Sequence, residues 1–473
     1  MNDITAIFAF LKYCLGYKRN MSRMIAGMDW QELYSFASKQ ALLGLCFEGI
    51  ERLGKEYSEE LRLNPIGREL LMTWMGKAQQ IRRQNMKVNA VASKLYSMLR
   101  EDGLRCCILK GQGNALIYPN AYSRNPGDID VWVNASRERI MEYAQKKFEL
   151  GDDIRLQHLE TSLDGVPVEL HFFPCSMNNP IYHARLQKWF RRNADLQCSH
   201  IVGLPDGAGD IAIPTTAFNV VYQLTHLYHH FFDEGIGMRQ IIDYYYVVCD
   251  FYKVYQNSSK ITPSLFFDKA SCTRQFESEL SLHSLASLFP LKGGSTSHPD
   301  PLTLRGEGGN RPTRCSEPLR SKDGGPKRSS PDCAGWDRLS IEGDNSAGST
   351  TVVTSYASTA LDVAQRELKY LGLWKFAGAV MYVLKEVLGL SEDKMIVPVD
   401  EKRGRLLLAE ILDGGNFGRH FTKYAGFTHQ SMGKKYFLKI WRNMHFVRYY
   451  PAEALCEPLF RTWHFFWRLK YKK

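Results

Sequence analysis

Three carboxylates in two apolar runs are the residues of this sequence whose types and spacing best suit chemistry. Asp128 and Asp130 lie two positions apart at the start of the run 128–133, and Glu169 lies within the run 166–171. Both runs have the composition of strands, and residues two apart on a strand point to the same face. Neighbouring carboxylates repel each other, and a hard divalent cation such as Mg²⁺ neutralises them. The pattern therefore indicates metal-dependent phosphoryl or nucleotidyl transfer. Two solvated aspartates at a strand edge are the alternative.

The segments around these carboxylates resemble the nucleotidyltransferase superfamily that includes DNA polymerase beta. That superfamily has a Gly-containing turn, an Asp-x-Asp strand and a later Asp or Glu on another strand. A closer resemblance is to a bacterial family of uncharacterised nucleotidyltransferases, in which the turn reads Leu-Lys-Gly, here residues 109–111, and an Arg-containing loop, here residues 122–125, precedes the Asp-x-Asp. This chain departs from many superfamily members at the turn, where it has Gly111-Gln112-Gly113 instead of Gly-Ser or Gly-Gly.

The resemblance implies transfer of a nucleoside monophosphate from a nucleoside triphosphate to an acceptor hydroxyl, with release of pyrophosphate. Asp128 and Asp130 would hold two Mg²⁺ ions, and Glu169 would complete the metal site and help to deprotonate the acceptor. Lys110 and the backbone amides near Gly111 would contact phosphate oxygens. The acceptor and the base preference do not follow from the resemblance.

Two arginines are further candidates for binding the triphosphate. Arg124 lies in the loop before the Asp-x-Asp, and Arg239 lies in a Gly-x-x-x-Arg…Asp segment similar to one that follows the catalytic sheet in the family. Arg239 and Asp243 are one helical turn apart, so an ion pair within the helix is the alternative.

A pair of histidines lies in the same part of the sequence. His226 and His230 are four residues apart and share a helical face. They line the active-site cleft, are satisfied core histidines, or hold a metal, although no third ligand is evident in the sequence.

The order of the expected elements indicates an α+β fold, with a small mixed nucleotidyltransferase sheet and extensive flanking helices. Strands are expected at 105–109 and 128–133, and Asp164-Gly165 indicates a hairpin between strands at 155–163 and 166–172. We expect five regions: an N-terminal helical region (1–98), a nucleotidyltransferase core (99–175), a helical region (176–260), a disordered insertion rich in Gly, Ser and Pro (291–354), and a C-terminal helical region (355–473).

Two features of the C-terminal half leave alternatives open. The Gly-rich run 413–418 follows a helical segment and not a strand, so we expect a helix end and turn there rather than a phosphate-binding loop. The tail 436–473 mixes aromatic with basic residues. Such a segment lies on an anionic membrane surface, stacks on nucleic acid, or packs its aromatic side chains into the core.

Composition limits the class of protein. The chain has 473 residues and a formal net charge of +11, which favours an acidic partner such as a nucleotide, a nucleic acid or an anionic membrane, or is simply a basic surface. Its 11 cysteines have no Cys-x-x-Cys spacing, which is typical of a reducing compartment without a zinc site. No apolar stretch reaches about 18 residues, and the N-terminal apolar run is too short for a signal peptide. We therefore expect a cytoplasmic protein, with membrane association through the tail as a further option.

Two other functions fit the same residues. A binding or regulatory protein would keep the fold and the nucleotide site but not the turnover. A toxin-like nucleotidyltransferase would modify RNA or protein, which the basic charge allows.

Overall fold

A four-stranded mixed sheet carries the three carboxylates. Its strands are β1 (Cys106–Leu109), β2 (Ile129–Val133), β3 (His158–Leu163) and β4 (Val166–His171). In this computed structural model, which describes residues 3–18, 20–150, 155–256, 349–421 and 432–471, the strand order is β1-β2-β4-β3. The pairs β1–β2 and β3–β4 are antiparallel, whereas β2 and β4 run parallel. The α+β fold with a small mixed sheet is thus confirmed.

The hairpin between β3 and β4 fixes which of their residues face each other. Asp164 and Gly165 form the turn with φ values of 49° and 70°. Two positive φ values in succession match the twist of the flanking strands. His158 and His171 consequently lie opposite each other, each six residues from the turn (164 − 158 and 171 − 165).

The two faces of the sheet pack against different helices. On one face Val131 and Leu170 join a core with Leu95 of the long helix α6 (Arg68–Glu101). On the other face Trp132 contacts Phe218, with ring centroids 6.3 Å apart. Because side chains alternate along a strand, Asp130 shares this second face with Trp132.

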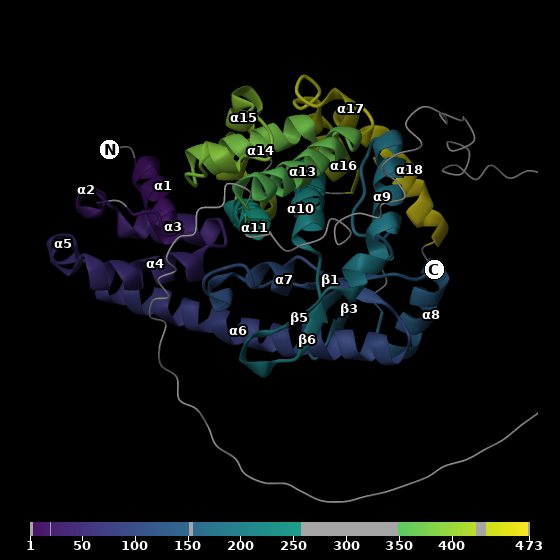
Figure 1. Ribbon diagram of the computed structural model, residues 1–473, viewed down its shortest axis with the longest axis horizontal. Coiled ribbons are helices and arrows are strands. Elements are labelled where there is room, and N and C mark those ends of the chain that lie inside the picture. Colours follow the sequence, from purple (N-terminus) through teal and green to yellow (C-terminus); the bar gives the residue numbers. More distant parts are fainter. Residues whose placement is uncertain (1–2, 19, 151–154, 257–348, 422–431, 472–473) are drawn as a thin grey trace, which may run out of the picture. The chain divides into compact units, whose positions relative to one another are not determined.

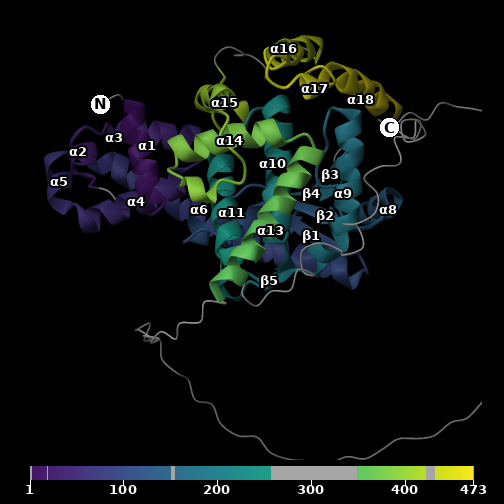
Figure 2. The same cartoon turned by 45° about the horizontal axis from the view of Figure 1, so that its top comes forward.

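Helices flank the sheet in both halves of the chain. Figure 1 shows α6 on one side of the strands and the helices α10 and α11 on the other, and Figure 2 shows α13 alongside both of the latter. The helices before the sheet are α1 (Asp3–Cys14), α2 (Ser22–Ala26), α3 (Trp30–Lys39), α4 (Leu43–Glu56), α5 (Ser58–Leu63) and α6. Those within and after it are α7 (Gly111–Ala115), α8 (Arg137–Lys147), α9 (Pro180–Ser199), α10 (Thr216–Asp233) and α11 (Met238–Gln256), with a small hairpin of β5 (Ile201–Gly203) and β6 (Asp210–Ala212).

The C-terminal helices complete the core around α10. They are α13 (Ser349–Tyr370), α14 (Trp374–Glu386), α15 (Glu401–Gly414), α16 (Met432–Met444), α17 (Pro451–Ala454) and α18 (Glu457–Tyr471). Phe376 of α14 lies 4.8 Å from Tyr228, and Phe446 lies 4.4 Å from Phe231, measured between ring centroids. All described residues belong to one compact unit, which comprises residues 1–267 and 347–473. The boundaries predicted between the helical regions and the nucleotidyltransferase core fall inside this unit and stay predictions.

Several local expectations can be compared with these elements. Helix α7 begins at Gly111, directly after the turn, because the chain reverses at Lys110 and Gly111 (φ 52° and 40°) and continues at once as a helix. The run 413–418 is a helix end and turn, as expected, with Gly415 at φ 64°. Of the predicted disordered insertion, residues 291–348 lie outside the described residues, and residues 349–354 belong to α13.

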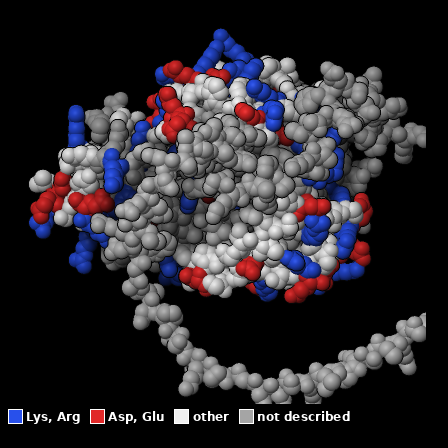
Figure 3. Space-filling model, in the orientation of Figure 1, with Lys and Arg blue, Asp and Glu red and all other residues white. Residues whose placement is uncertain are grey.

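The tail has both buried and exposed aromatic side chains among the residues described. Phe446 and Tyr450 are buried in the core, whereas Phe465 and Phe466 are exposed. On the face drawn in Figure 3, basic and acidic side chains are interspersed among the described residues and do not separate into single-sign patches. In the part of the chain that the structure describes, no helix combines the length and apolar character needed to cross a bilayer.

Candidate active site

Asp130 and Glu169 are direct neighbours on the shared face of β2 and β4. Their Cα atoms pair across the two parallel strands, so both side chains rise from the same side of the sheet. Asp130 is only 4% exposed, and Glu169 is half-buried. Asp128 directly precedes β2 and is exposed, and its carboxyl group is close enough to feel the charge of Asp130. The fold therefore brings the three predicted carboxylates together from two segments of the sequence.

Lys110 reaches the same group from the end of β1. Its Nζ lies 2.9 Å from Asp130 Oδ1 and 2.6 Å from His226 Nε2. Lys110 and Gly111 both have positive φ, a conformation that is uncommon for a non-glycine residue and that clusters at functional sites. The backbone at this turn thus aims the lysine side chain at the carboxylates.

Two histidines complete the cluster, and sequence reasoning missed both. His171 Nε2 lies 3.0 Å from Asp130 Oδ1 and 3.1 Å from Glu169 Oε2. His158 Nδ1 lies 3.3 Å from Glu169 Oε2. The signal that could have found them was the hairpin register: His171 is two residues after Glu169, and the turn at 164–165 places His158 opposite it.

The charges in the cluster shift one another's ionisation. Repulsion from the neighbouring Asp130 raises the pKa of Asp128 to about 6. Burial alone would raise the pKa of Asp130, but Lys110 and His171 lower it far below its usual range. Burial would lower the pKa of His171, but hydrogen bonds to Asp130 and Glu169 raise it to about 9. Three carboxylates therefore face two cationic side chains, which leaves room for further positive charge.

Comparison with protein families identifies the domain that carries this cluster. A family model described as uncharacterised nucleotidyltransferase matches residues 26–261. This part of the chain belongs to that family. Searches of curated proteins and of solved structures found no match. The predicted resemblance to the family is thus confirmed, and the matched segment of the nucleotidyltransferase domain contains the whole four-stranded sheet.

Arg124 of the nucleotidyltransferase domain is buried in an ion pair. Its Nε and Nη2 donate to Asp243 Oδ1 and Oδ2, both at 2.8 Å, and Tyr118 Oη donates to Asp243 at 2.7 Å. Asp243 therefore pairs with Arg124 across 119 residues of sequence, instead of pairing with Arg239 one helical turn away. The pair anchors the loop that leads into Asp128 to helix α11.

Arg239 lies beside the same loop. Its Nη1 is 3.4 Å from the carbonyl oxygen of Asn125, and its guanidinium lies 5.5 Å from the ring centroid of Phe417. Asp243 and Asp128 both act on its charge, which indicates that the guanidinium lies within electrostatic reach of the carboxylate cluster. Burial lowers the pKa of Arg239.

His226 and His230 lie on the cluster side of α10. Lys110, His226 and His230 form a chain of contacts, since the two Nε2 atoms of the histidines are 3.0 Å apart. Burial lowers the pKa of both imidazoles, that of His230 to about 3. His226 and His230 share a helical face, as predicted, and Lys110 connects this pair to the carboxylate cluster.

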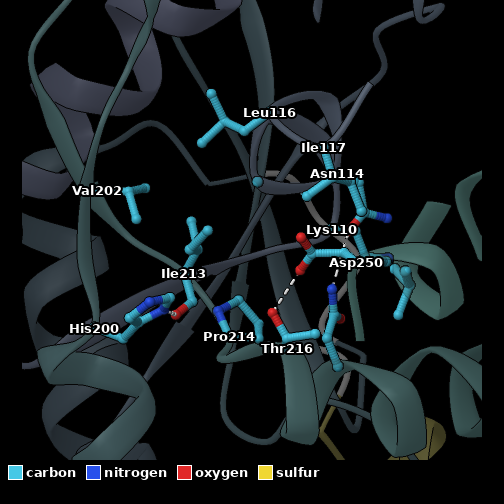
Figure 4. A pocket seen from close by; sticks show the side chains of 13 residues that line it. Lys110, Asn114, Leu116, Ile117, His200, Val202, Ile213, Pro214, Thr216 and Asp250 are labelled. Carbon is cyan, nitrogen blue, oxygen red and sulfur yellow. Dashed lines mark hydrogen bonds between the residues drawn. The ribbon is translucent and has the colours of Figure 1, made fainter. Parts of the chain in front are cut away.

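Two cavities adjoin the cluster. One of about 340 Å³ reaches His158 and is lined from β3, from the end of α10 and from α16 and α18, including Arg155, Glu234 and Lys439. The other, of about 190 Å³, is lined by Lys110, Asn114 and Asp250 among others, and Figure 4 shows Thr216 donating to Asp250 on its wall. The two cavities thus meet the cluster at Lys110 and at His158, and neither is lined by Asp128, Asp130 or Glu169.

Proposed function

We propose that this chain is a metal-dependent nucleotidyltransferase that moves a nucleoside monophosphate from a nucleoside triphosphate to a hydroxyl acceptor. The observation that carries the proposal is the pairing of Asp130 with Glu169, next to Asp128 and Lys110, inside a domain of the nucleotidyltransferase family. The resemblance to the superfamily of DNA polymerase beta supports the same reaction.

The donor set fits Mg²⁺. Asp128, Asp130 and Glu169 offer carboxylate oxygens from one sheet face, and their mutual repulsion, which raises the pKa of Asp128, is relieved by a divalent cation. Asp128 and Asp130 would hold two Mg²⁺ ions, and Glu169 would complete the site. When bound, such ions neutralise the charge that develops on the transferred phosphoryl group.

The chain's own residues would bind and orient the two substrates. Lys110, held beside Asp130, would contact phosphate oxygens together with the backbone amides at Gly111. Arg239 would face the triphosphate from α11, and Arg124 would hold the loop before Asp128 in position and contribute its charge. Glu169 would accept the proton of the acceptor hydroxyl. We place this reaction in the cytoplasm.

The proposal is tested by thermal shift with each nucleoside triphosphate, with and without Mg²⁺, on the wild type and on Asp128→Ala. We expect stabilisation only when nucleotide, metal and Asp128 are all present, and a matched change, Asp393→Ala, at an exposed carboxylate outside the cluster should behave as wild type. Absence of any shift with every nucleotide would refute the nucleotide site.

Pyrophosphate release separates turnover from binding. A protein that binds nucleotide with Mg²⁺ but releases no pyrophosphate with any acceptor would be the silent regulatory alternative. Transfer of a radioactive nucleotide to RNA or protein would identify the toxin-like alternative.

A further inference from the structure

The histidines around Glu169 form a cluster of their own beside the aspartates. One ligand atom from each of His158, Glu169 and His171 lies within 4.8 Å of the other two. Glu169 Oε2 is the centre of this group, 3.1 Å from His171 Nε2 and 3.3 Å from His158 Nδ1. Two atoms that each bind one ion at about 2.1 Å lie roughly 3.0–3.4 Å apart at octahedral or tetrahedral angles. Both distances to Glu169 are therefore compatible with ligands to a common ion.

The donor types select the ion. Mg²⁺ prefers oxygen ligands and retains water, whereas imidazole nitrogen suits first-row transition metals and Zn²⁺. Two imidazoles and one carboxylate make a nitrogen-rich site, in contrast to the all-oxygen pair Asp128 and Asp130. The two ends of the cluster thus differ in the cation that they favour.

The surroundings of the histidines are those of a preformed site. His158 and His171 are 8% and 1% exposed and lie on paired strands, so their positions are fixed by the sheet. Neither ring nitrogen of His158 makes a hydrogen bond within the described part of the chain. The side-chain amide nitrogen of Gln157 lies 3.3 Å from Nδ1 of His171, so a polar side chain also contacts the other nitrogen of this ring.

A cavity adjoins the histidines as well. His158 lines the cavity of about 340 Å³, which also reaches Glu234 at the end of α10. Space for an ion and its water ligands therefore lies next to His158, on a wall that none of the three carboxylates lines.

We propose that His158, Glu169 and His171 form a site for a divalent transition-metal ion such as Mn²⁺ or Zn²⁺, beside the carboxylates that favour Mg²⁺. The ion takes the place of the proton on Nε2 of His171, which is released to solvent. This inference rests on the proposed function because it assigns the metal preference of the same active site. It makes the protein a transferase whose two cation positions have different ligand chemistry. Mn²⁺ occupies the histidine position at concentrations at which Mg²⁺ does not.

The test is a MnCl₂ titration of the chelator-treated full-length protein, followed by electron paramagnetic resonance without nucleotide. We expect one bound Mn²⁺ with hyperfine coupling to imidazole nitrogen in the wild type and in His445→Gln, a control at an exposed histidine outside the cluster. His158→Gln should weaken Mn²⁺ binding at least about tenfold, since even outer-shell changes cost about 10–100-fold. Unchanged affinity and an unchanged spectrum in a folded His158→Gln would overturn the proposal.

Wild-type protein labelled with ¹⁵N-histidine gives an answer that does not depend on the folding of any variant. The coupling pattern of bound Mn²⁺ must change between ¹⁴N and ¹⁵N protein if imidazole is a ligand. A spectrum without nitrogen coupling rejects the site. Nitrogen coupling in a protein that binds no nucleotide would retain this site and reject the proposed function, whereas Mg²⁺-dependent nucleotide binding without nitrogen coupling would do the reverse.

Discussion

Asp130 of β2 and Glu169 of β4 lie opposite each other in a parallel strand pair, and His171 Nε2 bridges their carboxylates at 3.0 and 3.1 Å. The three groups are therefore one electrostatic unit. A change at any of them alters the ionisation and the cation affinity of the other two.

Asp130→Asn should abolish metal-dependent nucleotidyl transfer and leave the fold intact. The amide keeps the size of the side chain and a hydrogen bond to His171, but it removes the charge that holds Lys110 and a cation. We expect a loss of at least about a hundredfold in pyrophosphate release, since an outer-shell change alone costs about 10–100-fold. Full activity in Asp130→Asn would show that the mechanism is wrong, and a thermal melt checks the fold.

The buried pair of Arg124 and Asp243 should act mainly on stability. Asp243→Asn leaves the Arg124 guanidinium buried without its counter-charge, so we expect a loss of about 3–5 kcal/mol in the free energy of unfolding. Arg62→Ala, which breaks an exposed ion pair with Glu59, should change it by less than about 1 kcal/mol. Urea denaturation measures both, and equal effects of the two changes would contradict this assignment.

His171 should make stability depend on pH in the alkaline range. Its pKa is raised from about 6.5 in the unfolded chain to about 9, so its contribution is fully present below pH 6.5 and is lost as the pH rises through 9. The contribution is on the order of 3 kcal/mol. In the presence of a chelator, the difference in unfolding free energy between the wild type and His171→Gln should shrink from pH 6.5 to 9. A constant difference over this range would mean that His171 is not protonated in the folded protein.

Ionisation of Asp128 should lower the stability of the folded protein, and it should do so at a lower pH than the titration of His171. A carboxyl whose pKa is raised to about 6 disfavours folding once it ionises, so Asp128→Asn should gain stability relative to wild type as the pH rises from about 4 to 6. The two windows do not overlap, and denaturation curves at pH 4, 6 and 9 distinguish them.

Gly237, between α10 and α11, packs closely against the backbone of Asn416 in the turn that follows α15. A Cβ atom at Gly237 would lie 2.7 Å from Cα of Asn416, so Gly237→Ala should lower the free energy of unfolding by about 1–3 kcal/mol. A Cβ atom at Gly76 in α6 would meet nothing within 4 Å, so Gly76→Ala should be neutral or stabilising by up to about 1 kcal/mol. Chemical denaturation of the two variants tests whether residues 416–418 hold the α10–α11 loop in place.

The tail remains a candidate for contact with an anionic membrane. Helix α18 exposes Leu459, Phe465 and Phe466, which can enter the interface between headgroups and acyl chains. We expect the wild type to sediment with vesicles that contain anionic lipid and Phe465→Ser/Phe466→Ser to remain in solution. Binding of both proteins to RNA, and of neither to vesicles, would favour the nucleic-acid alternative.

Local sequence patterns were enough to predict most of the strands and the chemistry of the residues that they carry. Alternation with a period of two put Asp128 and Asp130 on one face, the Asp164-Gly165 dipeptide specified a hairpin, and apolar composition marked the strands. These features are local, because they depend on residues only a few positions apart. The family resemblance then pointed to the carboxylates as a group.

Which segments of the chain meet in space depends on contacts between residues far apart in the sequence. The parallel pairing of β2 with β4 sets Asp130 opposite Glu169. Asp243 forms its ion pair with Arg124, which is 119 residues away, and not with Arg239 on its own helix. Burial explains the pairing of Asp243 with Arg124. A buried carboxylate has no water to donate hydrogen bonds to it, and the guanidinium of Arg124, in the loop before Asp128, supplies two donors in a bidentate geometry. His158 and His171 joined the site for a similar reason, because the register of a hairpin and the pairing of its strands with β2 are settled by packing the whole sheet.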